Sequence, residues 1–207
     1  MKSWYGRAIL AVLALAAMPG ALAQQAASGG ATLKCEGPFA KDSSHAKLVE
    51  AFGAPNVAFE EVDAAEGEKM MASVVFAKDP KRRLEITWKD EAERRMPGMV
   101  LAAEGSAWTA GSGLRIGTSL ADVEAANGKP FKLSGFDWDY GGTVNDWQDG
   151  TLAKFPGCRL GLRFEPDDAA PPAALKKVAG DQEFASNDPN MRAAKPKISE
   201  IFLAYPD

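Results

Sequence analysis

Residues 119–130 read Ser-Leu-Ala-Asp-Val-Glu-Ala-Ala-Asn-Gly-Lys-Pro and carry the signals of a short helix at both ends. A hydroxyl residue, Ser119, precedes the apolar run as an N-cap, and Gly128 and Pro130 stop the helix. The same order occurs 75 residues earlier, where Ser44 precedes residues 45–52 and a Gly-x-Pro sequence follows. The chain therefore contains two similar predicted helices, one near the start of each half.

Segments typical of β-strands follow each predicted helix. In the first half they are residues 57–62, 70–77 and 84–88, with a turn at 79–82 and an edge strand at 99–103, and in the second half they are 131–136, 143–147, 159–164 and 198–205. We therefore predict an α+β fold of two related units, each a helix followed by an antiparallel sheet, which together form one compact body.

The expected units span residues 35–110 and 111–207, after a flexible leader at 24–34 that is rich in Gln, Ala, Ser and Gly. Residues 166–197 interrupt the last hairpin with Pro166, Pro171 and Pro172 and a short helical stretch at 173–178. We expect this insert to be an exposed excursion. Each half is near the lower size limit for an independent core, so the two sheets should adjoin.

The first 23 residues resemble a signal peptide. Lys2 and Arg7 precede an apolar run at 8–18, and Ala21 and Ala23 supply the small residues that a signal peptidase requires. The apolar run is too short to cross a hydrocarbon core of about 30 Å, so no transmembrane segment is expected. Gln24 rather than Cys follows the predicted cut after Ala23, which argues against lipoprotein processing. We expect an exported, periplasmic protein.

Composition excludes several classes of protein. With 46% apolar residues the chain is not a disordered one, and 24 basic against 28 acidic residues argue against a nucleic-acid partner. One His and two Cys are too few for a zinc site of four Cys and His ligands, and we expect no metal or cofactor. In an oxidising compartment Cys35 and Cys158 favour a disulfide, with two buried free thiols as the alternative.

Residues 114–130 resemble a known envelope signature. Ile116-Gly117-Thr118, Val123 and the Gly128-Lys129-Pro130 ending are similar to the Ile-Gly-x-[Ser/Thr]-x-x-x-Val…Gly-x-Pro pattern of the small outer-membrane assembly lipoproteins of the SmpA/OmlA type. The β-lactamase inhibitor protein fold has a related design of tandem helix-then-sheet repeats. The whole chain is also similar to exported envelope proteins of Gram-negative bacteria. The resemblance implies a fold and a place in the cell envelope.

The segment 137–150 is the candidate binding site. Six of its residues combine carboxylates with large aromatic rings: Asp137, Trp138, Asp139, Tyr140, Asp146 and Trp147. Such a set can hold sugars or a partner's side chains. The alternative is that the tryptophans enter the core while the aspartates lie on turns. As a calcium loop starting at Asp137 the segment fails, because Gln148 stands where a bidentate Glu is needed.

No convincing catalytic set is found in the sequence, so we predict that the protein is not an enzyme. Ser44 and Lys47 match a Ser-x-x-Lys pattern, but a helix cap and a solvent-facing Lys explain them. His45 is expected to be exposed in the first turn of its helix. The basic residues at 78–83, Arg94 and Arg95 fit a solvated surface, with an anionic lipid or glycan phosphate site as the alternative.

Together these features predict a non-catalytic periplasmic interaction module. It would bind an envelope protein or a glycan through its sheet surface and the 137–150 loop. One alternative is an inhibitor of a periplasmic or exogenous enzyme. Another is a small-ligand or glycan binder with weak hydrolase activity through carboxylates such as Asp137 and Asp146.

Overall fold

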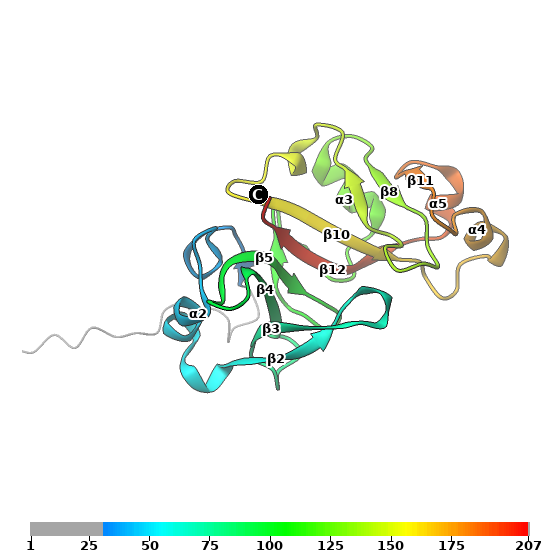
Figure 1. Cartoon of the computed structure of the whole chain (residues 1–207). Coiled ribbons are helices and arrows are strands. Elements are labelled where there is room, and N and C mark those ends of the chain that lie inside the picture. The colour runs from blue at the N-terminus through cyan, green and yellow to red at the C-terminus, as the bar shows by residue number, and fades with distance from the viewer. Residues whose placement is uncertain (1–30, 207) are drawn as a thin grey trace, which may run out of the picture.

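A six-stranded antiparallel sheet runs through the molecule, which is described over residues 31–206 by a computed structural model (Figure 1). Its strand order is β10-β12-β5-β4-β3-β2. The strands are β2 (Val57–Asp63), β3 (Lys69–Val75), β4 (Leu84–Asp90), β5 (Arg95–Ala102), β10 (Arg159–Glu165) and β12 (Lys197–Ala204). The prediction of a mixed α+β fold with antiparallel sheets in a compact body is confirmed.

The two helices predicted from the sequence are present as α2 (His45–Phe52) and α3 (Leu120–Asn127). The side chain of Ser44 accepts a hydrogen bond from the backbone N–H of Lys47 at 3.3 Å, and Ser119 caps α3 in the same way at 3.2 Å. At the other ends Gly53 and Gly128 have φ values of 85° and 81°, which favour glycine. The caps therefore fix where each of the two helices begins and ends.

Two smaller sheets flank the large one. The first is β11 (Glu183–Ala185), β8 (Lys132–Ser134) and β9 (Val144–Asp146), and the second is β1 (Thr32–Leu33), β6 (Thr109–Ala110) and β7 (Leu114–Arg115). The remaining short helices are η1 (Gly37–Phe39), η2 (Ala54–Asn56), η3 (Ala65–Gly67), η4 (Thr151–Ala153), α4 (Pro172–Lys177) and α5 (Pro189–Ala193). The leader expected at 24–34 thus ends earlier than predicted, because Leu33 is fully buried in β1, which pairs with β6.

One main core joins both halves of the chain. Strand register places alternate residues of the six-stranded sheet on a single inward face, among them Leu84, Ile86, Val100, Ile201, Leu203 and Leu162. Leu48 and Phe52 of α2 and Leu120 and Val123 of α3 belong to the same buried cluster. Because a strand alternates its side chains, the other face of this sheet lies outside the main core.

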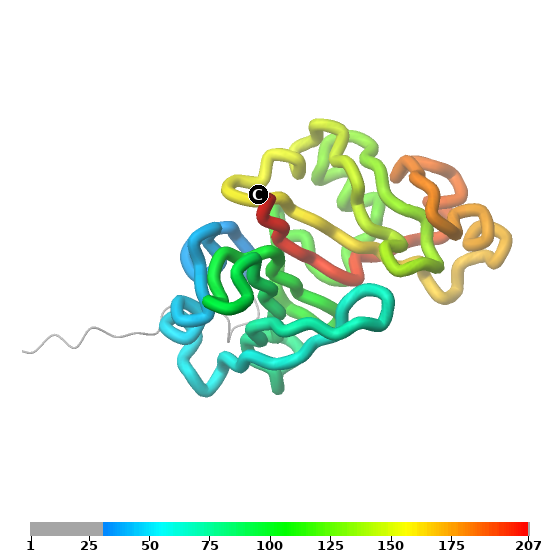
Figure 2. The backbone as a smooth tube through the Cα atoms, viewed as in Figure 1, coloured from blue at the N-terminus to red at the C-terminus, as the bar shows by residue number. Residues whose placement is uncertain are grey.

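The strand β5 lies inside the sheet, which corrects the prediction of an edge strand at 99–103. It pairs with β4 on one side and with β12, the last strand of the chain, on the other. Figure 2 shows the red C-terminal segment running between the green and yellow parts of the chain. This pairing could not be predicted from the sequence because about a hundred residues separate the two strands, and local patterns carry no information on long-range partners.

The insert 166–197 is part of the core, not an exposed excursion. Val178, Met191 and Ala194 have no exposed surface, and β11 pairs with β8. Arg192 donates to the carboxylate of Glu124 on α3 at 2.5 Å, and Ser186 donates to the same carboxylate. The insert therefore closes one side of the second half.

The predicted disulfide between Cys35 and Cys158 is confirmed, with the two Cα atoms 5.8 Å apart. It ties the beginning of the described chain to the residue before β10. The predicted signal peptide at 1–23 and the first part of the leader, at 24–30, lie outside the described residues. Across residues 31–206, none of the helices has both the length and the apolar character that a membrane span requires.

Candidate functional site

The outward face of the six-stranded sheet forms a broad, partly apolar surface, which we call the open face. Its centre consists of Thr87 on β4, Met99 and Leu101 on β5, and Phe202 and Ala204 on β12, all half-buried. A second small cluster, Val62, Ala72 and Val74, lies on the same face and is separate from the main core. The buried apolar residues of α2, α3 and α5 all belong to the main core, on the other face.

Charged residues surround this centre. Arg83 contacts Glu85 at 2.8 Å and Glu60 at 3.7 Å, and Arg163 contacts Glu200 at 3.6 Å. Burial raises the pKa of Glu200 above its ordinary value of 4.5; Arg163 opposes the shift, and the nearby carboxylates of Glu165 and Glu85 add to it. The open face therefore keeps a carboxylate whose charged form is partly deprived of water.

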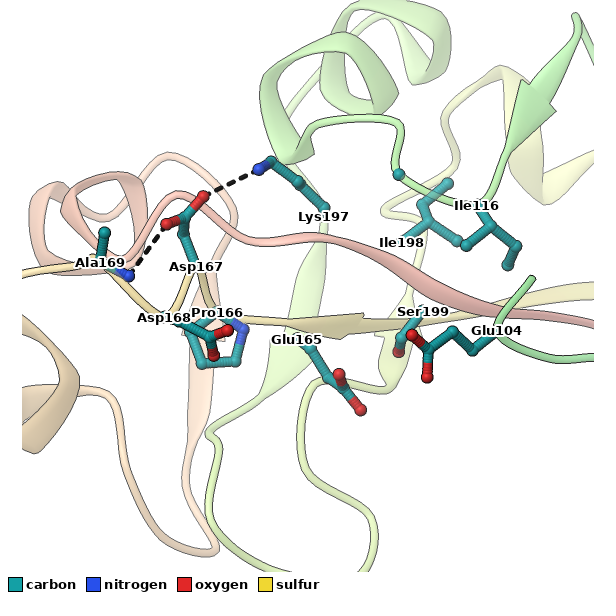
Figure 3. A pocket seen from close by; sticks show the side chains of 11 residues that line it. Glu104, Ile116, Glu165, Pro166, Asp167, Asp168, Ala169, Lys197, Ile198 and Ser199 are labelled. Carbon is teal, nitrogen blue, oxygen red and sulfur yellow. Dashed lines mark hydrogen bonds and ion pairs between the residues drawn. The ribbon is translucent and has the colours of Figure 1, made fainter. Parts of the chain in front are cut away.

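At one end the open face leads to an acidic cleft of about 360 Å³ (Figure 3). Glu104, Glu165, Asp167 and Asp168 line it, together with Lys197 and Ser199. Lys197 donates to Asp167 at 2.8 Å, and the N–H of Ala169 donates to the same carboxylate at 3.0 Å. The hydrogen bond from Lys197 is the largest cause of the lowered pKa of Asp167. Figure 3 shows Glu165 projecting from its strand and Glu104 next to Ser199.

The structure divides the six predicted site residues into two groups. Asp137, Trp138, Asp139 and Tyr140 lie in the turn between β8 and β9, whereas Asp146 and Trp147 lie at the far end of β9, where Asp146 is opposite Lys132. Three strand residues span about 10 Å. The two groups therefore do not converge on one site.

The first group presents an aromatic pair on a firmly held loop. The rings of Trp138 and Tyr140 pack edge to face with centroids 5.4 Å apart, and Tyr140 is 50% exposed. The indole N–H of Trp138 donates to the carbonyl of Gly135 at 2.9 Å. The Nε of Arg163 on β10 donates to the carbonyl of Gly141 at 2.9 Å. Arg163 therefore links this loop to the open face.

The second group is anchored to the core. Trp147 packs on Phe131 with ring centroids 5.1 Å apart and donates its indole N–H to the carbonyl of Leu160 at 3.0 Å. Asp146 accepts hydrogen bonds from both the backbone and the side chain of Gln148. Asp146 and Trp147 line a cleft of about 400 Å³ between β9 and β10, together with Asp149, Arg159 and Phe202. Trp147 is thus partly a core residue and partly a wall of this cleft.

His45 is half-buried, so the prediction of an exposed imidazole is wrong. Its Nδ1 lies 2.8 Å from the hydroxyl of Ser73, which also accepts the indole N–H of Trp88 at 2.8 Å. Burial, and then the charge of Arg94, lower the pKa of His45. Ser73 is fully buried, which prevents it from acting as a nucleophile towards a substrate in solution. A lone hydroxyl residue within the apolar strand 70–77 was the sequence signal for this contact.

The other polar motifs have structural partners. Lys47 contacts the carboxylate of Asp42 at 2.7 Å, on the solvent-facing side of α2. Arg82 contacts Asp79 at 2.7 Å, and its guanidinium lies 4.1 Å from the ring centroid of Phe76. Within residues 31–206 no three His, Cys, Asp or Glu side chains are grouped so as to hold a metal ion.

The sequence predicts binding through a sheet surface without locating that surface. The signal for its place is the alternation in residues 198–205, where the outward Glu200 and Phe202 alternate with the buried Ile201 and Leu203. Comparisons with protein-family models, with curated proteins and with solved structures gave no match.

Proposed function

We propose that the protein is a non-catalytic binding module of the bacterial periplasm, which holds an envelope protein against its open face and the 137–142 loop. The observation that carries this proposal is the Trp138–Tyr140 pair, in which Tyr140 is 50% exposed, on a loop fixed by hydrogen bonds to its own backbone and to β10. Exposed aromatic residues of this kind are frequent anchors of protein interfaces.

The rigidity of the loop favours binding. The N–H of Phe164 donates to the carbonyl of Gly142 at 3.0 Å, and the N–H of Gly142 donates to the carbonyl of Gly135 at 3.1 Å. A loop that is already ordered loses little conformational entropy when a partner docks. The aromatic pair can therefore contribute most of its contact energy to affinity.

The proposed periplasmic location rests on the signal-like first 23 residues and on the Cys35–Cys158 disulfide, since disulfides persist in oxidising compartments.

We also propose that the two halves are a duplication. In each half a capped helix is followed by four strands, β2 to β5 in the first and β8, β9, β10 and β12 in the second, with β11 in the insert. Diverged pairing in the second half would explain why β8 and β9 lie outside the large sheet.

The proposed function can be tested by replacing Tyr140 with a photo-crosslinking amino acid in living cells and identifying the adducts. A discrete protein adduct at position 140, absent when the same amino acid replaces exposed Glu50 on α2, is the expected result. If the partner found in the adduct is an enzyme, the protein belongs to the inhibitor class of interaction modules. If no protein adduct forms, or if only glycan is attached, the proposal is wrong.

The cleft between β9 and β10 favours a second candidate, a small-ligand or glycan site. Trp147 and Phe202 offer aromatic surface there, and Asp146, Asp149 and Arg159 offer polar groups. Asp137 lies at the other end of the β8–β9 hairpin and cannot pair with Asp146 as the two carboxylates of a glycosidase do. For this cleft we therefore propose ligand binding alone. A saturable rise in melting temperature with a sugar panel, lost in Arg159→Ala, would support it.

A further inference from the structure

We propose that the open face docks a cationic segment of its protein partner, a stretch in which Lys or Arg alternates with apolar side chains. This inference rests on the proposed function and specifies the chemistry of its partner. The juxtaposition that carries it is an apolar strip crossing β4, β5 and β12 beside glutamates on β2, β4, β10 and β12 and at the cleft end of the face.

The apolar strip has the chemistry of a contact surface. Met99 and Leu101 on β5 lie opposite Ala204 and Phe202 on β12, and all four side chains are half-buried. Gly161 on β10 continues the strip, and the ring of Phe202 occupies the space that a side chain at Gly161 would need. Apolar partner residues would cover these side chains and remove their remaining surface from water.

The charges around the strip are unbalanced. Five glutamates, Glu60, Glu85, Glu104, Glu165 and Glu200, border the open face and its cleft, against three arginines. Arg83 and Arg163 contact Glu60, Glu85 and Glu200, and Arg159 lies opposite Ala204 on β12. Glu104 and Glu165 form no ion pair within residues 31–206. Lys197, the one cation among the residues that line the acidic cleft, is held by Asp167. A partner that supplies cations would complement this field, whereas an anionic membrane or a nucleic acid would be repelled.

At Glu200 the shortage of cations affects a single carboxylate. Its carboxylate is half-buried, accompanied by one arginine at 3.6 Å, and repelled by Glu165 and Glu85. A carboxylate in this position is incompletely solvated in the unbound protein. A guanidinium or ammonium group from a partner would supply the hydrogen bonds and the countercharge that it lacks.

The test uses two fluorescent eight-residue peptides, one alternating Arg with Leu and one alternating Glu with Leu, and fluorescence anisotropy with the intact disulfide-bonded protein. The Arg-Leu peptide should bind, more weakly as salt increases, and the Glu-Leu peptide should not. In Glu85→Gln/Glu200→Gln the affinity should fall about tenfold, which corresponds to about 1.4 kcal/mol. Glu50→Gln/Glu91→Gln removes the same net charge from exposed positions away from the face and should change the affinity less than about twofold.

Three results would overturn the inference. They are an absence of binding by the Arg-Leu peptide, an equal loss in the two double variants, and equal binding of the two peptides. Equal losses would mean that net charge alone attracts the peptide. Thermal unfolding of each variant shows that it is folded before titration. Because the crosslink at position 140 in cells uses neither peptide, failure here with a discrete adduct there leaves the proposed function standing and removes only the cationic partner.

Discussion

Leu101 on β5 and Phe202 on β12 lie directly opposite each other across the antiparallel pair that joins the two halves of the chain. Leu101 comes from the first half and Phe202 from the last strand of the chain, and both side chains point to the open face. The centre of the candidate binding surface is therefore built at the junction of the halves, so neither half alone would present it.

Neighbouring residues on β12 should differ sharply in their contribution to stability. Leu203 is fully buried on the inward face, so Leu203→Ala should reduce the free energy of unfolding by about 2–5 kcal/mol. Phe202 is only half-buried on the outward face, and Phe202→Ala should cost about 1 kcal/mol. Urea unfolding of both variants measures the difference. An equal loss of unfolding free energy in the two variants would show that the open face is covered.

The 137–142 loop should depend on Gly142. This residue has a φ of 74°, and an added Cβ would lie 1.9 Å from the carbonyl oxygen of Phe164. Gly142→Ala should therefore lose about 1 kcal/mol for the left-handed backbone and a further 1–3 kcal/mol for the collision. Gly113→Ala is the matched control, since its φ is 92° and nothing lies within 4 Å of an added Cβ. If the two variants unfold at the same urea concentration, the close contact between the loop and β10 is wrong.

Removing the disulfide should be costly, because it closes a separation of 123 residues. The chain-entropy model gives a loss of about 4–5 kcal/mol for Cys35→Ala/Cys158→Ala. Urea unfolding with and without a reducing agent measures this loss. The double variant should be insensitive to the reductant, and a native protein equally insensitive to it would contradict the prediction.

Local signals in the sequence were sufficient for the elements that depend on neighbouring residues. Ser44, Ser119, Gly53 and Gly128 mark the ends of α2 and α3, because capping is a contact between residues three or four positions apart. The strands of the large sheet were assigned from their composition. The disulfide followed from there being only two cysteines in a chain expected to be exported.

Features that depend on distant partners were missed. The inner position of β5 requires β12, and burial of the insert requires Met191 and Ala194 to reach the core. His45 on α2 is half-buried because its ring lies against β3, where its Nδ1 is 2.8 Å from the hydroxyl of Ser73. The six candidate site residues are close in sequence, yet the β8–β9 hairpin separates Asp146 from Asp137. Sequence proximity thus predicted a single site where the hairpin makes two.

Stability should fall in mildly acidic solution because of His45. Its pKa in the folded protein is below the ordinary value of 6.5, owing to burial and then to Arg94. The unfolded chain therefore binds a proton more readily, so this contribution to stability is present above about pH 6.5 and is lost as the pH falls below it. His45→Asn keeps an acceptor for Ser73 and should be less sensitive to pH between 7.5 and 5.5 in urea unfolding. An identical slope in both proteins would exclude His45 as the cause.

The pH dependence of stability contributed by Glu200 should have the opposite sign to that of His45. Burial raises its pKa in the folded state above 4.5, so the folded protein retains this proton more readily than the unfolded chain. The contribution to stability is present below about pH 4.5 and is lost as the pH rises through the folded pKa. Glu200→Gln should therefore be more stable than the native protein at pH 7, with the gain disappearing in acid.

Glu50→Gln controls for the loss of one negative charge from an exposed position on α2. If Glu200→Gln is instead less stable at pH 7, the ion pair with Arg163 outweighs the burial of the carboxylate. A stabilised Glu200→Gln that also binds the Arg-Leu peptide more weakly would separate the two roles of this residue. Its charge would then reduce stability and increase affinity, as expected where a binding surface keeps a carboxylate that folding alone does not favour.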